Sequence, residues 1–250
     1  ARAGATVCHA GKIGPDGQLL ADTLASSGVD TSLISLSSGP SGHTIIQVDS
    51  QGQNCILLYG GSNQKITHQE VDLALEGFGS GDYLIVQNEI NCLDYIMEQG
   101  AKKGLSIVFN PSPIDEHIST LPLHLVSLLV FNEIEGAALA GTSEEGQILD
   151  ILRSRWPSCQ LLLTLGSHGC IYDDGTQRIT QGVYRTKAVD TTAAGDTFTG
   201  YFVACLAAGM DAPSCLNLAS RAAAIAVSRP GAAPSIPTMD EVRGSTLSLA

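Results

Sequence analysis

The sequence contains few basic side chains. It has 13 Lys and Arg residues against 25 Asp and Glu residues, which gives a formal net charge of −12 at pH 7. A protein that binds along a nucleic-acid backbone needs a positively charged face to neutralise the phosphates. The sequence supplies no such face, so we expect no nucleic-acid partner.

Long hydrophobic runs are also missing. The longest, over residues 121–131, is interrupted by His124 and Ser127 and is shorter than the roughly 20 residues that cross a bilayer. The chain does not open with the charged and then apolar segment of a secretory signal, although a signal removed earlier would leave no trace. We therefore expect a cytoplasmic protein with no membrane partner.

The cysteine pattern excludes two further kinds of protein. The cysteines form no Cys-x-x-Cys pair, and none lies near a histidine at zinc-finger spacing. Their odd number favours reduced thiols in the cytosol, and a disulfide-bonded fold is the less favoured alternative. The seven cysteines are Cys8, Cys55, Cys92, Cys159, Cys170, Cys205 and Cys215.

The composition favours a folded α/β protein. Hydrophobic residues make up 44% and charged residues 15% of the 250 residues, which excludes intrinsic disorder, and the length suits one large domain or two small ones. Buried-strand patterns alternate with helical periodicity, which predicts an open, mostly parallel sheet between two helical layers, a three-layer α/β/α fold. The predicted strands are 6–10, 83–86, 105–109, 125–131, 160–165 and 170–173, and the predicted helices are 91–103, 133–140, 144–155, 197–208 and 212–228.

Residues 38–61 depart from this alternation. Two short β-rich runs, 44–48 and 54–58, flank a turn over 49–53, which predicts a hairpin. Because the predicted strands of the main sheet are apolar throughout, we expect this hairpin to lie outside the sheet as a small β lid, with residues 1–37 and 62–250 forming the main domain. The polar residues that we expect on one face of the hairpin are Thr44, Gln47, Asp49, Gln53 and Asn54.

The segment most informative about chemistry runs from Ala188 to Gly200. It is typical of a strand end, a turn of small residues at 193–195 and an apolar helix that begins near Asp196. Small residues let the backbone approach a ligand, and the free amides of a helix N-terminus favour an anion such as phosphate. A carboxylate beside such a site can accept a proton from an attacking hydroxyl group. A helix cap at Asp196 with no catalytic role fits the same pattern, and the residues alone do not separate the two.

This segment resembles the C-terminal signature of the ribokinase family of carbohydrate kinases, which here reads Asp190-Thr-Thr-Ala-Ala-Gly-Asp196. A single motif of this kind is weak evidence, whereas several in the family's order are specific. On these motifs the sequence is identified as a member over roughly residues 1–243. The other matching segments are 11–17, 110–113, Asn132-Glu133 with Glu135, 164–169 and 226–235.

The resemblance implies roles for the matching residues. Asp196 is implied as the base that deprotonates the sugar hydroxyl, and Glu89 as an acid that contacts the sugar. The implied anion hole for the transferred phosphate consists of Ala193, Ala194 and Gly195. The implied nucleotide contacts are Asn132, Thr164, Leu165, Gly166, Ser167, His168, Gly169, Gly195 and Ser220.

Two metal ions are implied in the same way. Glu135 with Asn132 matches the pair that positions magnesium, largely through water. A monovalent cation, usually potassium, is implied at Asp190, Thr192, Ala226, Arg229, Gly231 and Ser235, mostly through backbone carbonyls. Without the resemblance, the glycines of 164–169 fit a plain hairpin turn, and Asn132 fits the start of a helix.

The sequence departs from the family at its start. Members begin with a strand whose Asp binds the sugar, followed by a Gly-Gly-Lys-Gly motif with an Asn, and neither has a counterpart here. We therefore expect the first central strand and most sugar contacts to be missing. Ser220 stands where a His or Asn near the adenine is common, and Ala193 where most members carry Gly.

The resemblance implies ATP-dependent phosphorylation of the primary (5-) hydroxyl of D-ribose, assisted by Mg²⁺ and K⁺. The alternatives are another sugar or nucleoside kinase of the family, and an inactive remnant that binds a sugar or a nucleotide. Since the 38–61 hairpin resembles the family's lid, through which members pair, a homodimer through the lid is implied.

Overall fold

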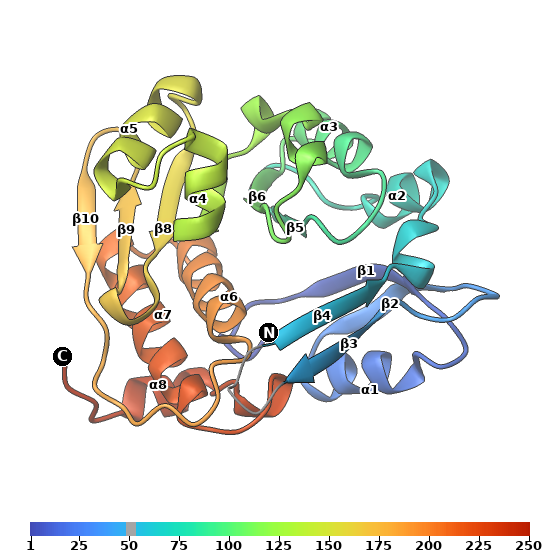
Figure 1. Ribbon diagram of the computed structural model, residues 1–250. Helices are drawn as coiled ribbons and strands as arrows, with labels where there is room; N and C mark the ends of the chain where they lie inside the picture. The colour runs from blue at the N-terminus through green and yellow to red at the C-terminus, as the bar shows by residue number, and fades with distance from the viewer. Residues whose placement is uncertain (49–53) are drawn as a thin grey trace.

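A six-stranded sheet forms the centre of the molecule (Figure 1). In the computed structural model, which describes residues 1–48 and 54–250, the strand order is β10-β9-β8-β7-β6-β5. Strands β5 to β8 pair in parallel, whereas β9 and β10 are antiparallel, so the prediction of a mostly parallel sheet is confirmed. The strands are β5 (Tyr83–Gln87), β6 (Ser106–Asn110), β7 (Leu128–Asn132), β8 (Gln160–Thr164), β9 (Cys170–Asp173) and β10 (Arg178–Gln181).

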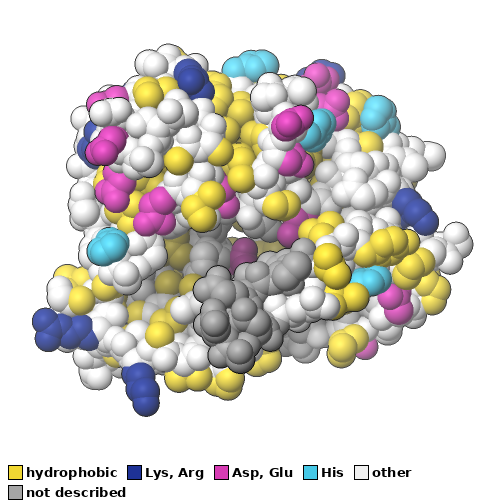
Figure 2. All heavy atoms as spheres, in the orientation of Figure 1, with side chains coloured by type: hydrophobic (Ala, Val, Ile, Leu, Met, Phe, Trp, Pro, Cys, Tyr) yellow, Lys and Arg dark blue, Asp and Glu magenta, His cyan; other side chains and the backbone are white. Residues whose placement is uncertain are grey.

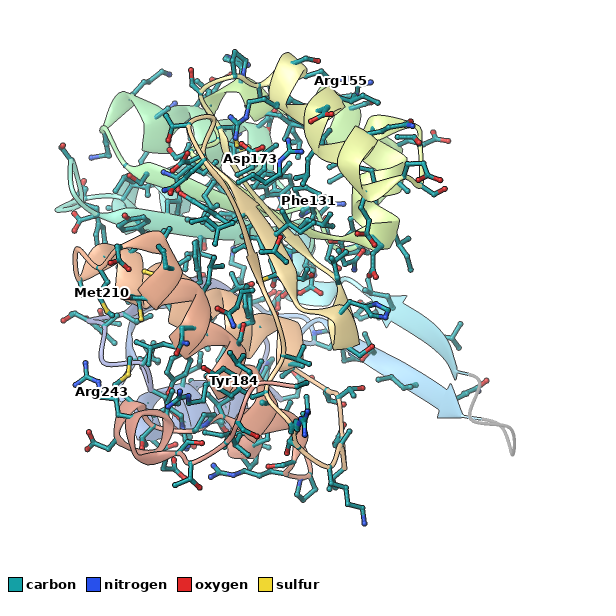
Figure 3. The ribbon with its side chains drawn as sticks, turned by 90° about the vertical axis from the view of Figure 1, so that its left-hand side faces the viewer. Phe131, Arg155, Asp173, Tyr184, Met210 and Arg243 are labelled. Carbon is teal, nitrogen blue, oxygen red and sulfur yellow. The ribbon has the colours of Figure 1, made fainter. Side chains whose placement is uncertain are left out.

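Helices bury both faces of this sheet. Ile107 and Phe109 of β6 belong to one apolar cluster and Val108 between them to the other, because side chains alternate along a strand. Phe131, labelled in Figure 3, lies in the first cluster, under the helices α4 and α5. The three-layer α/β/α prediction is therefore confirmed. The helices of the first layer are α2 (His68–Ala74), α3 (Leu93–Lys102), α4 (Glu133–Ala140) and α5 (Glu145–Arg155), and those of the second are α6 (Ala194–Ala207), α7 (Ala212–Val227) and α8 (Met239–Gly244).

The first part of the chain forms a separate small sheet. The strand predicted over 6–10 overlaps its first strand, whereas the second strand and the separation from the main sheet were not predicted. Strands β1 (Cys8–Ile13) and β2 (Asp30–Leu36) pair in parallel and are connected by α1 (Gln18–Ser26). An ion pair ties this sheet to α2, since Lys12 Nζ lies 2.8 Å from the Glu70 carboxylate. The same carboxylate accepts a hydrogen bond from Ser35 Oγ of β2 at 2.9 Å, so one side chain joins three elements.

The predicted hairpin is present as a third sheet. Strands β3 (His43–Val48) and β4 (Asn54–Tyr59) are antiparallel and hydrogen-bond to no other strand among the described residues. Figure 3 shows the hairpin projecting away from the helices and the main sheet. The predicted turn over 49–53 lies outside the described residues. That the hairpin closes as a lid, and that residues 1–37 and 62–250 act as one domain, stay predictions.

The expectation of one polar hairpin face is wrong. Thr44 and Gln47 lie on opposite faces, because residues an odd number of positions apart along a strand point to opposite sides. Apolar side chains are instead exposed on both faces, and Figure 2 shows hydrophobic side chains gathered on this side of the molecule, beside the grey residues. The exposed fractions are 55% for Ile45, 58% for Ile46, 53% for Leu57 and 60% for Leu58.

Two further observations concern the chain as a whole. Within residues 1–48 and 54–250, no helix combines the length and the apolar character that a bilayer crossing requires. Four cysteines are buried as free thiols, where cysteine behaves as a small hydrophobic residue. They are Cys159, Cys170, Cys205 and Cys215, all buried.

Candidate active site

The carboxyl ends of four parallel strands meet at one edge of the main sheet and line a cavity of about 200 Å³. Ligands of open α/β sheets bind at this edge, outside the ends of the strands. The N-terminus of α6 closes the cavity with Gly195, Asp196 and Thr199. Each of the four strands ends in a polar residue that lines it, namely Gln87 of β5, Asn110 of β6, Asn132 of β7 and Thr164 of β8.

Helix α6 begins with unused backbone amides. Ala193 precedes it in the left-handed region, at φ 59°, and provides no side-chain cap. The amide of Ala194 donates to the carbonyl of Thr191 at 3.2 Å, and regular helical bonding starts only at Thr197. Across residues 1–48 and 54–250, the amides of Gly195 and Asp196 therefore meet no acceptor, and two such amides at a helix N-terminus favour an anion.

Asp196 lines the cavity as an exposed first-turn acid. A capping role would need its carboxylate to accept a hydrogen bond from the helix, and no such bond occurs in the part of the chain that the structure describes. Glu89, on the loop after β5, does not line the cavity but lies near Asp196. Burial, and then the negative charge of Asp196, raise the pKa of Glu89. Two acids from different elements are thus close enough to interact electrostatically.

Asn132 and Glu135 form a reciprocal cap at the start of α4. Glu135 N donates to Asn132 Oδ1 and Asn132 N donates to Glu135 Oε2, both at 2.9 Å. The helix-start interpretation of these residues is therefore correct, yet both also line the cavity. The second carboxylate oxygen, Glu135 Oε1, has no hydrogen bond to any described residue. An oxygen so placed fits a water-mediated contact to Mg²⁺, which keeps several waters when bound.

The predicted nucleotide loop forms the turn between β8 and β9. Of its residues 164–169, Thr164 lines the cavity, and Leu165 N closes the turn on the carbonyl of Gly169 at 2.8 Å. Gly169 has φ 95°, and a Cβ there would clash with the carbonyl of Gln181, so its glycine has a structural cause. The nucleotide role of this loop stays a prediction.

Ser220, predicted to contact the nucleotide, is another site residue that the structure does not bring to the cavity. It is buried on α7, with 7% of its surface exposed, and contacts Cys170. Burial raises the pKa of the Cys170 thiol to about 12.

The predicted cation loops are joined by Asp190. Its Oδ1 accepts from Thr192 N at 2.9 Å and its Oδ2 from Gly231 N at 2.8 Å, and these bonds lower its pKa. The Arg229 side chain pairs with Glu241 at 2.6 Å. Because a guanidinium is positively charged and only donates, the backbone carbonyl of Arg229 is its one possible ligand for a cation. Among the described residues, no three His, Cys, Asp or Glu side chains gather as metal ligands. The oxygen donors available, mainly carbonyls, fit a hard cation held by the backbone.

Sequence reasoning missed several residues of the cavity. A signal for the strand-end residues was present, because each is a polar residue at the end of an apolar run. Thr199 lies one helical turn after Asp196, and this spacing could have identified it. The missed residues are Gln87, Asn110, Ser112, Val130 and Thr199.

A three-layer α/β/α fold with a carboxylate and free helix amides at the carboxyl edge of its sheet defines an enzyme that acts on an anionic group. The sequence matches the model of the pfkB family carbohydrate kinases over residues 1–239, and the chain belongs to this family. The prediction of a sugar kinase is thereby confirmed.

Individual relatives agree with this assignment. The chain is 32% identical over 243 residues to a ribokinase of Staphylococcus aureus (strain COL). The aligned region covers 92% of this chain and 79% of the relative. It is 25% identical over 209 residues to a deoxyribokinase of Salmonella typhi, across 80% of this chain and 68% of that one. The structure of Arabidopsis thaliana ribokinase complexed with ribose and ATP has a TM-score of 0.87 and 28% identity, across 97% of this chain and 82% of that one.

Proposed function

We propose that this protein transfers the γ-phosphate of ATP to the 5-hydroxyl of D-ribose. The observation that carries the proposal is the pairing of Asp196 with the free amides of Gly195 and Asp196 in one cavity. The similarity to a ribokinase of S. aureus and to the ribose- and ATP-bound ribokinase of A. thaliana supports this choice of substrates.

The order of the strands suits a nucleotide, a phosphate and a sugar bound in line. Thr164 and its turn follow β8, and Asn132 and Glu135 follow β7. Glu89 follows β5, beyond the other two strands in the sheet order. ATP would then lie over β8 and β7, with the sugar toward β5, and Asp196 would stand at the point of transfer.

The transfer needs one base and a place for negative charge. The hydroxyl oxygen of ribose bonds to the γ-phosphorus, the bond from phosphorus to the bridging oxygen breaks, and ADP leaves with that electron pair. Asp196 accepts the hydroxyl proton, while the amides of Gly195 and Asp196 donate to the phosphoryl oxygens. Phosphoryl transfer depends mainly on such positioning and charge stabilisation.

We assign both metal ions to the residues that fit them. Asn132 and Glu135 would hold Mg²⁺ through water, and carbonyls of the 190–192 and 226–235 loops, with Ser235, would hold K⁺. When bound, these cations neutralise phosphate charge beside the amides of α6.

Ribose-dependent formation of ADP tests the proposal. ATP is supplied with D-ribose, 2-deoxy-D-ribose, D-fructose or adenosine, and D-ribose should give the highest kcat/KM. A higher value for 2-deoxy-D-ribose would favour the second candidate, a deoxyribokinase, which the S. typhi relative supports. No turnover with any acceptor would identify a remnant that only binds.

We also propose that two chains pair through the hairpin as a homodimer. An isolated two-stranded hairpin is marginally stable in water, and this one exposes apolar side chains on both faces. The Ile46→Asp variant should then be a monomer by light scattering. Leu73→Asp, a change at an exposed leucine of α2, is the matched control and should leave the dimer intact.

A further inference from the structure

The Glu89 carboxylate is placed by its loop rather than by partners of its own. No residue of the described chain donates a hydrogen bond to it, although the charge of Asp196 affects its pKa. Its position therefore depends on the backbone of residues 88–92, which connects β5 to α3.

On the upstream side, Asn88 attaches this loop to the segment after β6. Asn88 N donates to the carbonyl of Ser112 at 3.0 Å, and Asn88 Nδ2 donates to the carbonyl of Pro113 at 2.7 Å. Ser112 itself lines the cavity. One neighbour of Glu89 is thus fixed to the cavity wall.

On the downstream side, the Asn91 side chain binds both backbone groups of one residue, Ile66. Its Nδ2 donates to the carbonyl of Ile66 at 2.8 Å, and its Oδ1 accepts from Ile66 N at 3.0 Å. Asn91 N also donates to the carbonyl of Asn63 at 3.2 Å. Of the standard side chains, only the primary amide of Asn or Gln offers a donor and an acceptor in this arrangement, and Gln is one methylene longer.

The segment that Asn91 binds leads directly from the hairpin. Residues 61–66 follow β4, and Gln64 Nε2 donates to the carbonyl of Glu89 at 3.1 Å. After Asn91 the chain turns through Cys92, which has a left-handed φ of 61°, into α3. The loop is therefore fixed at a defined point between the end of the hairpin and the helix.

We infer that Asn91 is a positioning residue for the sugar site. Its paired hydrogen bonds to Ile66 hold Glu89 at its distance from Asp196 and attach Glu89 to the base of the hairpin. This inference rests on the proposed function, because it takes Glu89 as a sugar contact. When a side chain that contacts a ligand is displaced, the ligand binds more weakly. Even small displacements of such side chains have large effects.

Steady-state kinetics of Asn91→Ala, Glu89→Gln and the double variant test this inference. Asn91→Ala should raise the KM for D-ribose by about tenfold and leave the KM for ATP essentially unchanged. In the Glu89→Gln background, Asn91→Ala should add little, because its effect acts through Glu89. Asn217→Ala, which removes an amide from α7, is the matched control and should change neither KM.

The outcomes separate the inference from the proposed function. Equal effects of Asn91→Ala on the two KM values, or effects that add fully to those of Glu89→Gln, would overturn the positioning role while the sugar kinase stands. If the unaltered protein turns over no sugar, the proposed function falls and the positioning role falls with it. Should Asn91→Ala not fold, Asn91→Ser, whose hydroxyl can keep one of the two bonds, is measured against the same criteria.

Discussion

Glu89 lies close enough to Asp196 for the negative charge of Asp196 to raise the pKa of Glu89. The two acids come from different parts of the chain, since Glu89 follows β5 and Asp196 belongs to the first turn of α6. Carboxylates brought together in this way oppose folding, because like charges repel and burial disfavours the charged form. Such an arrangement is typical of functional sites.

Glu89→Gln should therefore stabilise the protein at neutral pH. The pKa of Glu89 is higher in the folded state than in the unfolded state, so the ionised carboxylate lowers the free energy of unfolding as pH rises through the folded pKa. The variant should melt at a higher temperature at pH 7, and the difference should vanish at pH values well below the ordinary pKa of glutamate. An equal melting temperature at pH 7 would contradict the proximity of the two acids.

Glu70 should show the opposite pH dependence. The hydrogen bond from Lys12, with others from Ser35 and Thr67, lowers its pKa from 4.5 to about 2. Its contribution to the free energy of unfolding is therefore fully present above about pH 4.5 and is lost as pH falls toward about 2.

Chemical denaturation of Glu70→Gln at several pH values tests this contribution. Because 31% of the side chain is exposed, solvent screening limits the expected loss at pH 7 to about 1 kcal/mol, and the loss should shrink toward pH 2. Glu98→Gln, at an exposed acid of α3, is the matched control. A loss of the same size at both ends of this range would mean that the ion pair does not stabilise the small sheet.

Potassium should accelerate turnover. The loops joined by Asp190 lead into the N-terminus of α6, and a cation held there by backbone carbonyls would attract the phosphate. We expect a several-fold higher kcat in potassium chloride than in sodium chloride or tetramethylammonium chloride. Asp190→Ala, which removes the hydrogen bonds to Thr192 and Gly231, should abolish this difference. Equal rates of the unaltered protein in all three salts would exclude the site.

Much of the fold could be predicted from local patterns. Strands such as 105–109 and 160–165 are continuous apolar runs because helices cover both faces of the sheet, and the observed strands agree closely with them. The small sheet of β1 and β2 was predicted only as a strand over 6–10, for a physical reason. Its strands are only partly buried, so their sequences carry weak apolar patterning, and their pairing depends on contacts such as that between Lys12 and Glu70.

The candidate site shows a similar limit. Asp196 and the small residues before it were recognisable because they are consecutive in the sequence. Glu89 and Asp196, by contrast, approach each other only through the tertiary fold, since one follows β5 and the other begins α6. The contact between Asn91 and Ile66 also leaves no pattern, since a side chain that binds the backbone of a residue distant in sequence has no fixed spacing. Ser220 was placed from the resemblance alone, and its burial against Cys170 depends on the packing of α7 on the sheet.

Turnover of Asp196→Asn tests the central claim most directly. The variant removes the proton acceptor while keeping the size of the side chain, so fold and ATP affinity should persist. We predict that the kcat for ribose-dependent ADP formation falls by about 10²–10⁴-fold, with the melting temperature and the KM for ATP little changed and with Glu98→Gln fully active. A loss of less than about tenfold would contradict the account, because Asp196 would then be a first-turn acid of α6 rather than the catalytic base.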